Sequence, residues 1–104
     1  MENKISFSDK AISDVTYMFD TVKYAVDSSI TALENSDLES AQKTLDAEYK
    51  IDSMEQQLKK EHITRLSNLE CTPAGSSVYL ELLTNLERVG DHSNNIAQMV
   101  LHTS

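Results

Sequence analysis

The sequence has few residues that break helices or cross-link a fold. Its 104 residues include two glycines, one proline, one cysteine and no tryptophan. The scarcity of glycine and proline leaves few turn signals, which disfavours a sheet of many short strands. A single cysteine excludes a disulfide within the chain and fits a reducing compartment. Length and composition therefore predict one all-α domain.

Basic residues are also scarce. Nine lysines and arginines stand against 17 aspartates and glutamates, so the net charge is −8. That charge repels the phosphates of nucleic acids, and no basic run offsets it, so we expect no nucleic-acid partner. The N-terminus does not resemble an export signal, and no apolar run approaches the roughly 18 residues of a membrane-spanning helix. We therefore expect a cytoplasmic location, either free or at the cytoplasmic face of the membrane as part of a larger membrane protein.

Periodic apolar residues and capping signals divide the chain into three long helices. The segment from Ser36 to Glu39 is typical of a capping box that begins a second helix, and Pro73 suits the first position of a third. We predict helices over residues 8–34, 37–68 and 73–102. Short connections between long helices favour antiparallel packing. The expected architecture is an elongated antiparallel three-helix bundle formed by the whole chain.

The first predicted helix has one stripe of apolar residues. They follow one another at intervals of three and four, which keeps them on one side of a helix. These residues are Ile12, Val15, Phe19, Val22, Val26, Ile30 and Leu33. We expect this stripe to face the other two helices. Tyr17 and Tyr24 lie on another side, where they contact either solvent or a partner.

Two pairs of carboxylates share a four-residue spacing, which points both members of a pair the same way. Glu48 and Asp52 form one pair in the second predicted helix, and Glu87 and Asp91 form the other in the third. The first pair lies within an apolar arc, where protons, basic partners or a metal must neutralise its charge. Gly90 lies within the third helix, where close approach of a neighbouring helix or ligand would offset its cost of up to about 1 kcal/mol relative to alanine.

Glu55 and Asn94 are accessory candidates for the same site. Such an oxygen-rich set suits Mg, Mn, Ca or iron, although a solvated acidic edge with ordinary ion pairs is the alternative. The chain has no His-x-x-x-His or Glu-x-x-His pattern, which disfavours a di-iron oxidase. It also lacks a glycine-rich phosphate loop, a Cys-x-x-Cys pair and a plausible catalytic triad, so we do not expect an enzyme.

Two segments of the chain resemble the signature sequences of the PhoU domain family. They are Glu48-Tyr49-Lys50-Ile51-Asp52 and Leu86-Glu87-Arg88-Val89-Gly90-Asp91-His92-Ser93-Asn94-Asn95-Ile96-Ala97. The second segment is long and chemically varied, so it gives most of the specificity. The resemblance covers the whole chain as a single three-helix repeat.

The resemblance implies that Glu48, Asp52, Glu87 and Asp91 bind divalent or ferric metal ions, for which Fe, Mn, Mg, Zn and Ni are candidates. It also implies a regulatory role in phosphate transport and homeostasis, with a phosphate transporter or its membrane domain as the partner. An interaction or oligomerisation module that binds no metal is the alternative function.

Full-length PhoU proteins contain two such repeats, whereas this chain has one. The resemblance therefore leaves two contexts open. One is a single-repeat regulator that forms a homo-oligomer. The other is the soluble C-terminal domain of a sodium/phosphate cotransporter, which the segment Cys71-Thr72-Pro73-Ala74-Gly75 favours.

Overall fold

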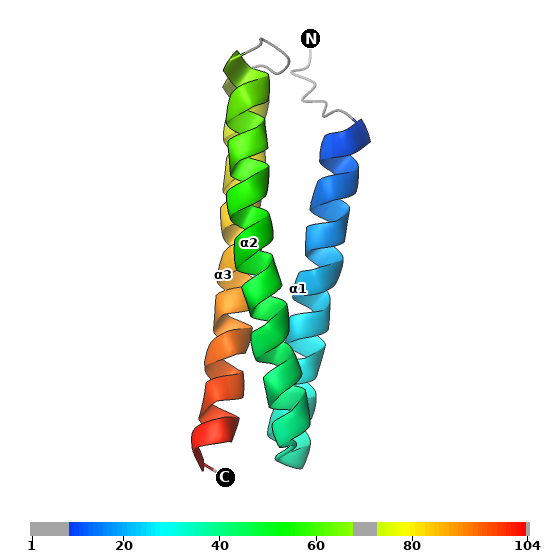
Figure 1. Ribbon diagram of the computed structural model, residues 1–104, viewed down its shortest axis with the longest axis vertical. Coiled ribbons are helices and arrows are strands. Elements are labelled where there is room, and N and C mark those ends of the chain that lie inside the picture. Colours follow the sequence, from blue (N-terminus) through cyan, green and yellow to red (C-terminus); the bar gives the residue numbers. More distant parts are fainter. Residues whose placement is uncertain (1–8, 68–72, 104) are drawn as a thin grey trace.

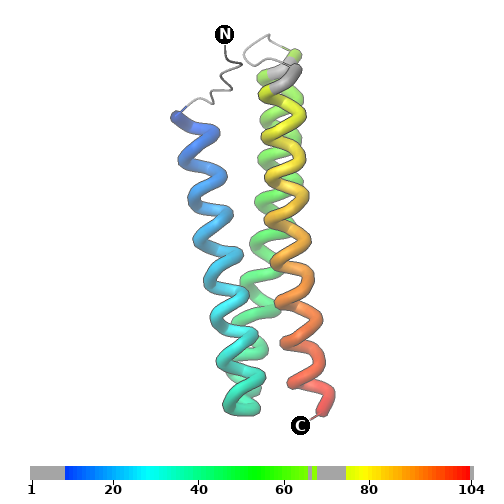
Figure 2. The backbone as a smooth tube through the Cα atoms, turned by 180° about the vertical axis from the view of Figure 1, so that it is seen from behind, coloured from blue at the N-terminus to red at the C-terminus, as the bar shows by residue number. Residues whose placement is uncertain are grey.

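The computed structural model describes residues 9–67 and 73–103, which form three helices. Helix α1 spans Asp9–Asn35, α2 spans Leu38–Ser67 and α3 spans Pro73–Thr103. The helices run down, up and down along a bundle of 54 × 27 × 18 Å, so α1 and α3 are parallel to each other and antiparallel to α2 (Figures 1 and 2). The predicted all-α three-helix bundle is confirmed. None of the described helices has a stretch apolar enough to span a bilayer.

Some predicted features cannot be compared with the structure. The helix limits at Ser8 and Asn68, together with Cys71 and Thr72 before the third helix, lie outside the described residues. The other limits agree to within one residue, and Pro73 is the first residue of α3 as predicted.

The connection between α1 and α2 is a tight turn. Ser36 has a positive φ of 51°, and the N–H of Asp37 donates to the carbonyl of Ala32 at 3.1 Å, which is a common way for a helix to end. The Asp37 carboxylate accepts hydrogen bonds from the Ser40 hydroxyl at 2.7 Å and the Glu39 N–H at 3.1 Å, and these bonds lower its pKa. The predicted capping box on Ser36 is therefore wrong by one residue, because Ser36 ends α1 and Asp37 caps α2.

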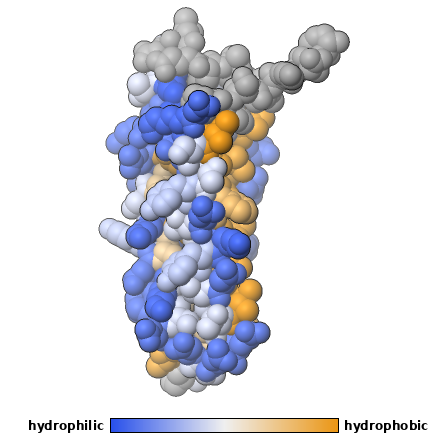
Figure 3. Space-filling model, turned by 90° about the vertical axis from the view of Figure 1, so that its right-hand side faces the viewer, coloured by the Kyte–Doolittle hydropathy of each residue, from blue (hydrophilic) through white to orange (hydrophobic). Residues whose placement is uncertain are grey.

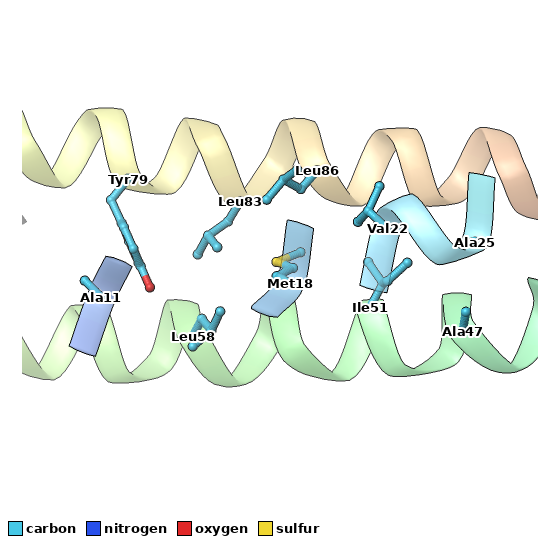
Figure 4. Packing of buried hydrophobic residues seen from close by; sticks show 10 residues of the cluster. All are labelled: Ala11, Met18, Val22, Ala25, Ala47, Ile51, Leu58, Tyr79, Leu83 and Leu86. Atoms are coloured by element: carbon cyan, nitrogen blue, oxygen red, sulfur yellow. The ribbon is translucent and has the colours of Figure 1, made fainter. Parts of the chain in front are cut away.

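The core lies along the axis of the bundle, where all three helices meet (Figure 4). Its largest fully buried apolar side chains come from each helix in turn: Met18, Ile51, Tyr79 and Leu83. A second, smaller cluster contains mostly alanines and one valine: Ala32, Ala41, Ala97 and Val100. Alanine at the contacts allows the helix axes to approach closely. In this part of the bundle the helices therefore pack through small side chains at short distance instead of through large ones.

The predicted apolar stripe of α1 is only partly in the core. Four of its members are about half exposed: Ile12 by 52%, Phe19 by 55%, Ile30 by 45% and Leu33 by 57%. The buried residues of α1 are mostly small, namely Ala11, Met18, Val22, Ala25, Ser28, Ser29 and Ala32. The expectation that the whole stripe faces the other helices is wrong, because small side chains bring α1 close to its neighbours and turn the larger residues to one flank.

A polar cluster lies where the end of α2 meets the start of α3. His62 is only 3% exposed, and its Nε2 lies 2.7 Å from the hydroxyl of Ser76. The imidazole stacks on the ring of Tyr79 with 4.8 Å between centroids, and the Arg65 guanidinium lies 5.6 Å from the same ring centre. Burial, and then the charge of Arg65, lower the pKa of His62. This histidine therefore stabilises the fold in its neutral form.

Protonation of His62 should destabilise the bundle. Because the folded chain holds the pKa of His62 below its ordinary value, the unfolded chain binds the proton more readily. The free energy of unfolding should therefore be highest above about pH 6.5 and fall as the pH drops below it. Urea unfolding followed by circular dichroism at a series of pH values measures this fall.

Two variants separate His62 from the other titrating groups. His62→Gln should flatten the pH dependence near neutrality, whereas His102→Gln changes an exposed histidine and should leave it intact. Equal slopes in the wild type and both variants would show that His62 does not cause the effect.

Candidate metal centre

Three of the predicted ligands meet on the face shared by α2 and α3. One carboxylate oxygen from each of Glu48, Glu87 and Asp91 lies within 4.8 Å of the other two. Glu48 and Glu87 are partly buried and Asp91 is exposed. Because α2 and α3 are antiparallel neighbours, the first member of the α2 pair meets both members of the α3 pair. The structure thus brings together an oxygen-rich group from residues far apart in the sequence.

Asp52 lies beside this group rather than in it. It is partly buried and accepts a hydrogen bond from Nε2 of Gln56 at 3.2 Å, one turn further along α2. Its charge still contributes to raising the pKa of both Glu48 and Glu87. Asp52 therefore belongs to the same acidic face, although its oxygens are not among those that converge.

The accessory candidates differ in their surroundings. Glu55 is partly buried and pairs with Lys59 at 3.0 Å, so a basic side chain already neutralises part of its charge. It nevertheless raises the pKa of Glu87 by its proximity. Asn94 is partly buried on α3, one turn beyond Asp91. These two residues extend the site along both helices.

The three convergent carboxylates repel one another. Burial is the first cause that raises the pKa of Glu48, followed by the charges of Asp52, Asp91 and Glu87. Burial also comes first for Glu87, followed by the charges of neighbouring acids, while Lys59 acts in the opposite direction. Among the described residues, no lysine or arginine forms an ion pair with Glu48, Glu87 or Asp91. A bound cation would relieve this repulsion.

Gly90 fixes the distance between the two helices at this site. A Cβ atom added at Gly90 would lie 3.0 Å from Cδ1 and 3.4 Å from Cγ2 of Ile51. Gly90 follows Glu87 by three residues, and Ile51 follows Glu48 by three, so the two residues occupy the same place in the two pairs. The contact between them therefore sets how closely the two sets of carboxylates approach.

The rest of the long α3 segment supplies the packing beneath the site. Leu86 and Ala97 are buried in the core, and the buried hydroxyl of Ser93 donates to the carbonyl of Val89 at 3.1 Å. Acids on one flank and small or apolar residues on the core side explain why this segment is chemically varied. Ile51 was not among the predicted site residues, although its position inside the first pair matches that of Gly90 inside the second.

The chain is a three-helix bundle with an acidic α2–α3 face that contains two E-x-x-x-D pairs. Residues 15–100 match the family model described as the PhoU domain. The chain therefore belongs to the PhoU domain family.

A curated relative matches nearly the whole length of this chain. The chain is 27% identical over 101 residues to phosphate-specific transport system accessory protein PhoU homolog 1 of Thermotoga maritima. The match covers 97% of this chain but 43% of that relative, so the chain spans less than half of the relative's length. No solved structure is significantly similar to this chain.

The contact between Gly90 and Ile51 leads to a prediction about the site. Gly90→Ala should push α2 and α3 apart between the carboxylate pairs and weaken the binding of a divalent cation roughly tenfold, as changes that misplace metal ligands commonly do. Isothermal titration calorimetry with Mn²⁺ measures the affinity.

A second substitution provides the control. Ile51→Val removes the Cδ1 atom that the new methyl group would meet at 3.0 Å. The double variant Gly90→Ala/Ile51→Val should therefore recover most of the affinity. If Gly90→Ala alone binds as tightly as the wild type, the helix spacing does not govern the site.

Proposed function

We propose that this protein is a metal-binding regulatory domain that acts in phosphate transport and homeostasis. The observation that supports it best is the convergence of the carboxylate oxygens of Glu48, Glu87 and Asp91 within 4.8 Å in a PhoU domain. The curated relative is an accessory protein of a phosphate-specific transport system, which favours a regulatory role over a catalytic one.

The donor set fits a hard cation. Carboxylate oxygens that bind one ion at about 2.1 Å lie no more than about 4.2 Å apart, so small side-chain rotations would suffice to close a group now within 4.8 Å. Asp52 and Asn94 follow Glu48 and Asp91 by one helical turn, and we propose that they complete the coordination together with water. Oxygen ligands suit Mg, Mn and ferric or ferrous iron best, while Zn and Ni also accept carboxylates.

Metal occupancy would change the charge of the face formed by α2 and α3. A divalent ion would neutralise two of the carboxylate charges there and fix side chains that otherwise repel one another. A partner that contacts this face would then bind either the metal-bound or the metal-free state more tightly. A non-catalytic domain can transmit a signal in this way. The proposed partner is a phosphate transporter or its membrane domain.

The proposed function fits two kinds of protein in which this domain would act. As the C-terminal domain of a sodium/phosphate cotransporter, it would lie at the cytoplasmic face of the membrane. As a single-repeat regulator, it would reach the transporter from the cytoplasm as a homo-oligomer. In both contexts the domain would act by contact.

The proposed metal site predicts different effects of one double variant on the melting temperature without metal and with metal. Glu87→Gln/Asp91→Asn should raise the melting temperature without metal, because the substitutions remove repulsion between neighbouring acids. The same variant should gain nothing from metal. The wild type should gain on the order of 10 °C when a binding metal is present at a hundredfold excess over its dissociation constant. Thermal denaturation with Mg²⁺, Mn²⁺, Fe³⁺, Zn²⁺ or Ni²⁺ tests this.

The matched control removes two acids away from the site. Asp27 and Glu81 are exposed residues of α1 and α3, so Asp27→Asn/Glu81→Gln should gain from metal as the wild type does. Equal stabilisation of all three proteins by every metal would indicate nonspecific binding to an acidic surface. Absence of any stabilisation would favour the interaction module that binds no metal.

The regulatory role has its own prediction. Replacing Glu48, Asp52, Glu87 and Asp91 by their amides in the full-length protein should change phosphate uptake in cells without changing the amount of transporter in the membrane. The reason is that the variant keeps the fold but loses the metal-dependent state of the α2–α3 face. Uptake of radiolabelled phosphate in phosphate-rich and phosphate-starved cells measures it. Identical uptake under both conditions would argue against this role.

A further inference from the structure

Helix α1 presents large apolar residues to solvent. Ile12, Phe19, Ile30 and Leu33 are each about half exposed, and Val15 and Val26 are partly buried beside them. These positions span about 30 Å of helix at 1.5 Å per residue. A monomer rarely leaves such a continuous stripe uncovered.

Helix α3 has a matching stripe. Val78, Leu82 and Val89 are exposed by 43%, 36% and 42%, and their spacing of four and seven residues keeps them on one side of the helix. Glu87 and Asp91 lie on the opposite flank, which faces α2. The exposed stripe of α3 is therefore turned towards α1.

The stripe of α1 is in turn on the flank nearer α3. Tyr17 and Tyr24 mark the other flank, because each lines a pocket together with residues of α2. Phe19 and Ile30 lie well over 90° around the helix from these tyrosines, at about 100° per residue. Seen from the side of α1, the apolar residues gather along one edge of the molecule and hydrophilic residues cover most of the rest (Figure 3).

We call the two stripes together the α1–α3 apolar face. It consists of Ile12, Phe19, Ile30, Leu33, Val78, Leu82 and Val89. With about half of each residue exposed, this face amounts to several hundred Å², on the order of the patches that mark interaction sites. Together with its polar margin it approaches the roughly 800 Å² that each partner buries in a standard protein interface.

The distribution of charge indicates what covers the α1–α3 apolar face. The chain has a net charge of −8, and the carboxylates of the candidate metal centre lie on the α2–α3 face. Two copies that met through acidic faces would repel each other, whereas none of the seven residues of the α1–α3 apolar face carries a charge. An anionic membrane is a poor occupant, because it would repel a chain whose net charge is −8.

We propose that the α1–α3 apolar face binds a second copy of this chain around a two-fold axis. The relative from Thermotoga maritima is more than twice as long as the segment that it shares with this chain, so that relative has room for a second unit of this size. The inference gives a surface to the homo-oligomer of the proposed function, and it does not depend on metal binding.

Sedimentation equilibrium of three proteins tests the proposal. Phe19→Asp/Ile30→Asp places two charges in the apolar face, and Tyr17→Asp/Tyr24→Asp places the same charges on the other flank of the same helix. The pairs are matched in exposure, at 55% and 45% against 60% and 50%. The wild type should dimerise, the first variant should dimerise at least about tenfold more weakly, and the second should match the wild type.

The outcomes that overturn the proposal are distinct. A wild type that stays monomeric at millimolar concentration, unchanged association of Phe19→Asp/Ile30→Asp, or loss of association only in Tyr17→Asp/Tyr24→Asp would each contradict it. So would a monomer whose binding to phosphatidylglycerol vesicles requires Phe19 and Ile30, because the face would then bind lipid. Circular dichroism confirms that each variant is helical.

Metal titration of the same three proteins keeps the two proposals separate. Phe19→Asp/Ile30→Asp should keep the thermal stabilisation by metal while it loses association. A wild type that dimerises but binds no metal would contradict the proposed function and leave the apolar interface standing. A wild type that binds metal but stays monomeric would contradict the apolar interface and leave the proposed function standing.

Discussion

The arrangement of the candidate site depends on one contact, the packing of Ile51 of α2 against the bare backbone of Gly90 of α3. Any side chain at Gly90 would reach within 3.0 Å of Ile51, so the two helices are as close there as an isoleucine allows. Glycine inside a helix costs up to about 1 kcal/mol relative to alanine, and that cost is offset only where close approach is needed. Here the closeness brings Glu48 into the same group as Glu87 and Asp91.

The close approach of α2 and α3 also places acidic side chains near one another. Burial and mutual repulsion raise the pKa of Glu48 and Glu87, so the carboxylates are held in a place that is unfavourable for them without a cation. Polar groups arranged against local stability are typical of binding sites rather than of structural surfaces. The buried His62 is the useful contrast, because its hydrogen bond to Ser76 and its stacking on Tyr79 serve the fold.

The bundle has two faces of different chemistry, and each face is formed by two helices. The α2–α3 face contains the convergent carboxylates, and the α1–α3 apolar face contains half-exposed large apolar residues. Because α3 takes part in both, its long signature segment has to place acids on one flank, small residues towards the core and Val89 on the other flank. A change of state at the metal site would thus occur on a helix that also contacts the proposed second copy.

The sequence was sufficient for the number of helices and for those limits that lie among the described residues, because apolar periodicity and breakers are local signals. It was also sufficient to pair Glu48 with the acids of α3. It was insufficient for the orientation of α1, where Ala11, Ala25 and Ala32 contact the core and Phe19 does not. Size alone predicts the wrong face when alanines permit closer packing.

Side-chain direction and turn geometry also could not be read from the sequence. Asp52 has the spacing of a ligand, but it accepts a hydrogen bond from Gln56 and its oxygens are not among those that converge. Ser36 is a residue type that often caps a helix. Here it adopts the left-handed conformation that ends α1, so it does not cap α2. Both outcomes depend on the local conformation and on which neighbouring group each residue contacts. Residue type and spacing do not determine these.

Anomalous X-ray diffraction from crystals of the chain grown with Mn²⁺ would show directly whether the carboxylates of α2 and α3 bind a cation. We expect an anomalous peak between α2 and α3, from manganese bound by oxygens of Glu48, Glu87 and Asp91. Ordered carboxylates at this site with no peak between them, or manganese bound only at other acids of the surface, would contradict it.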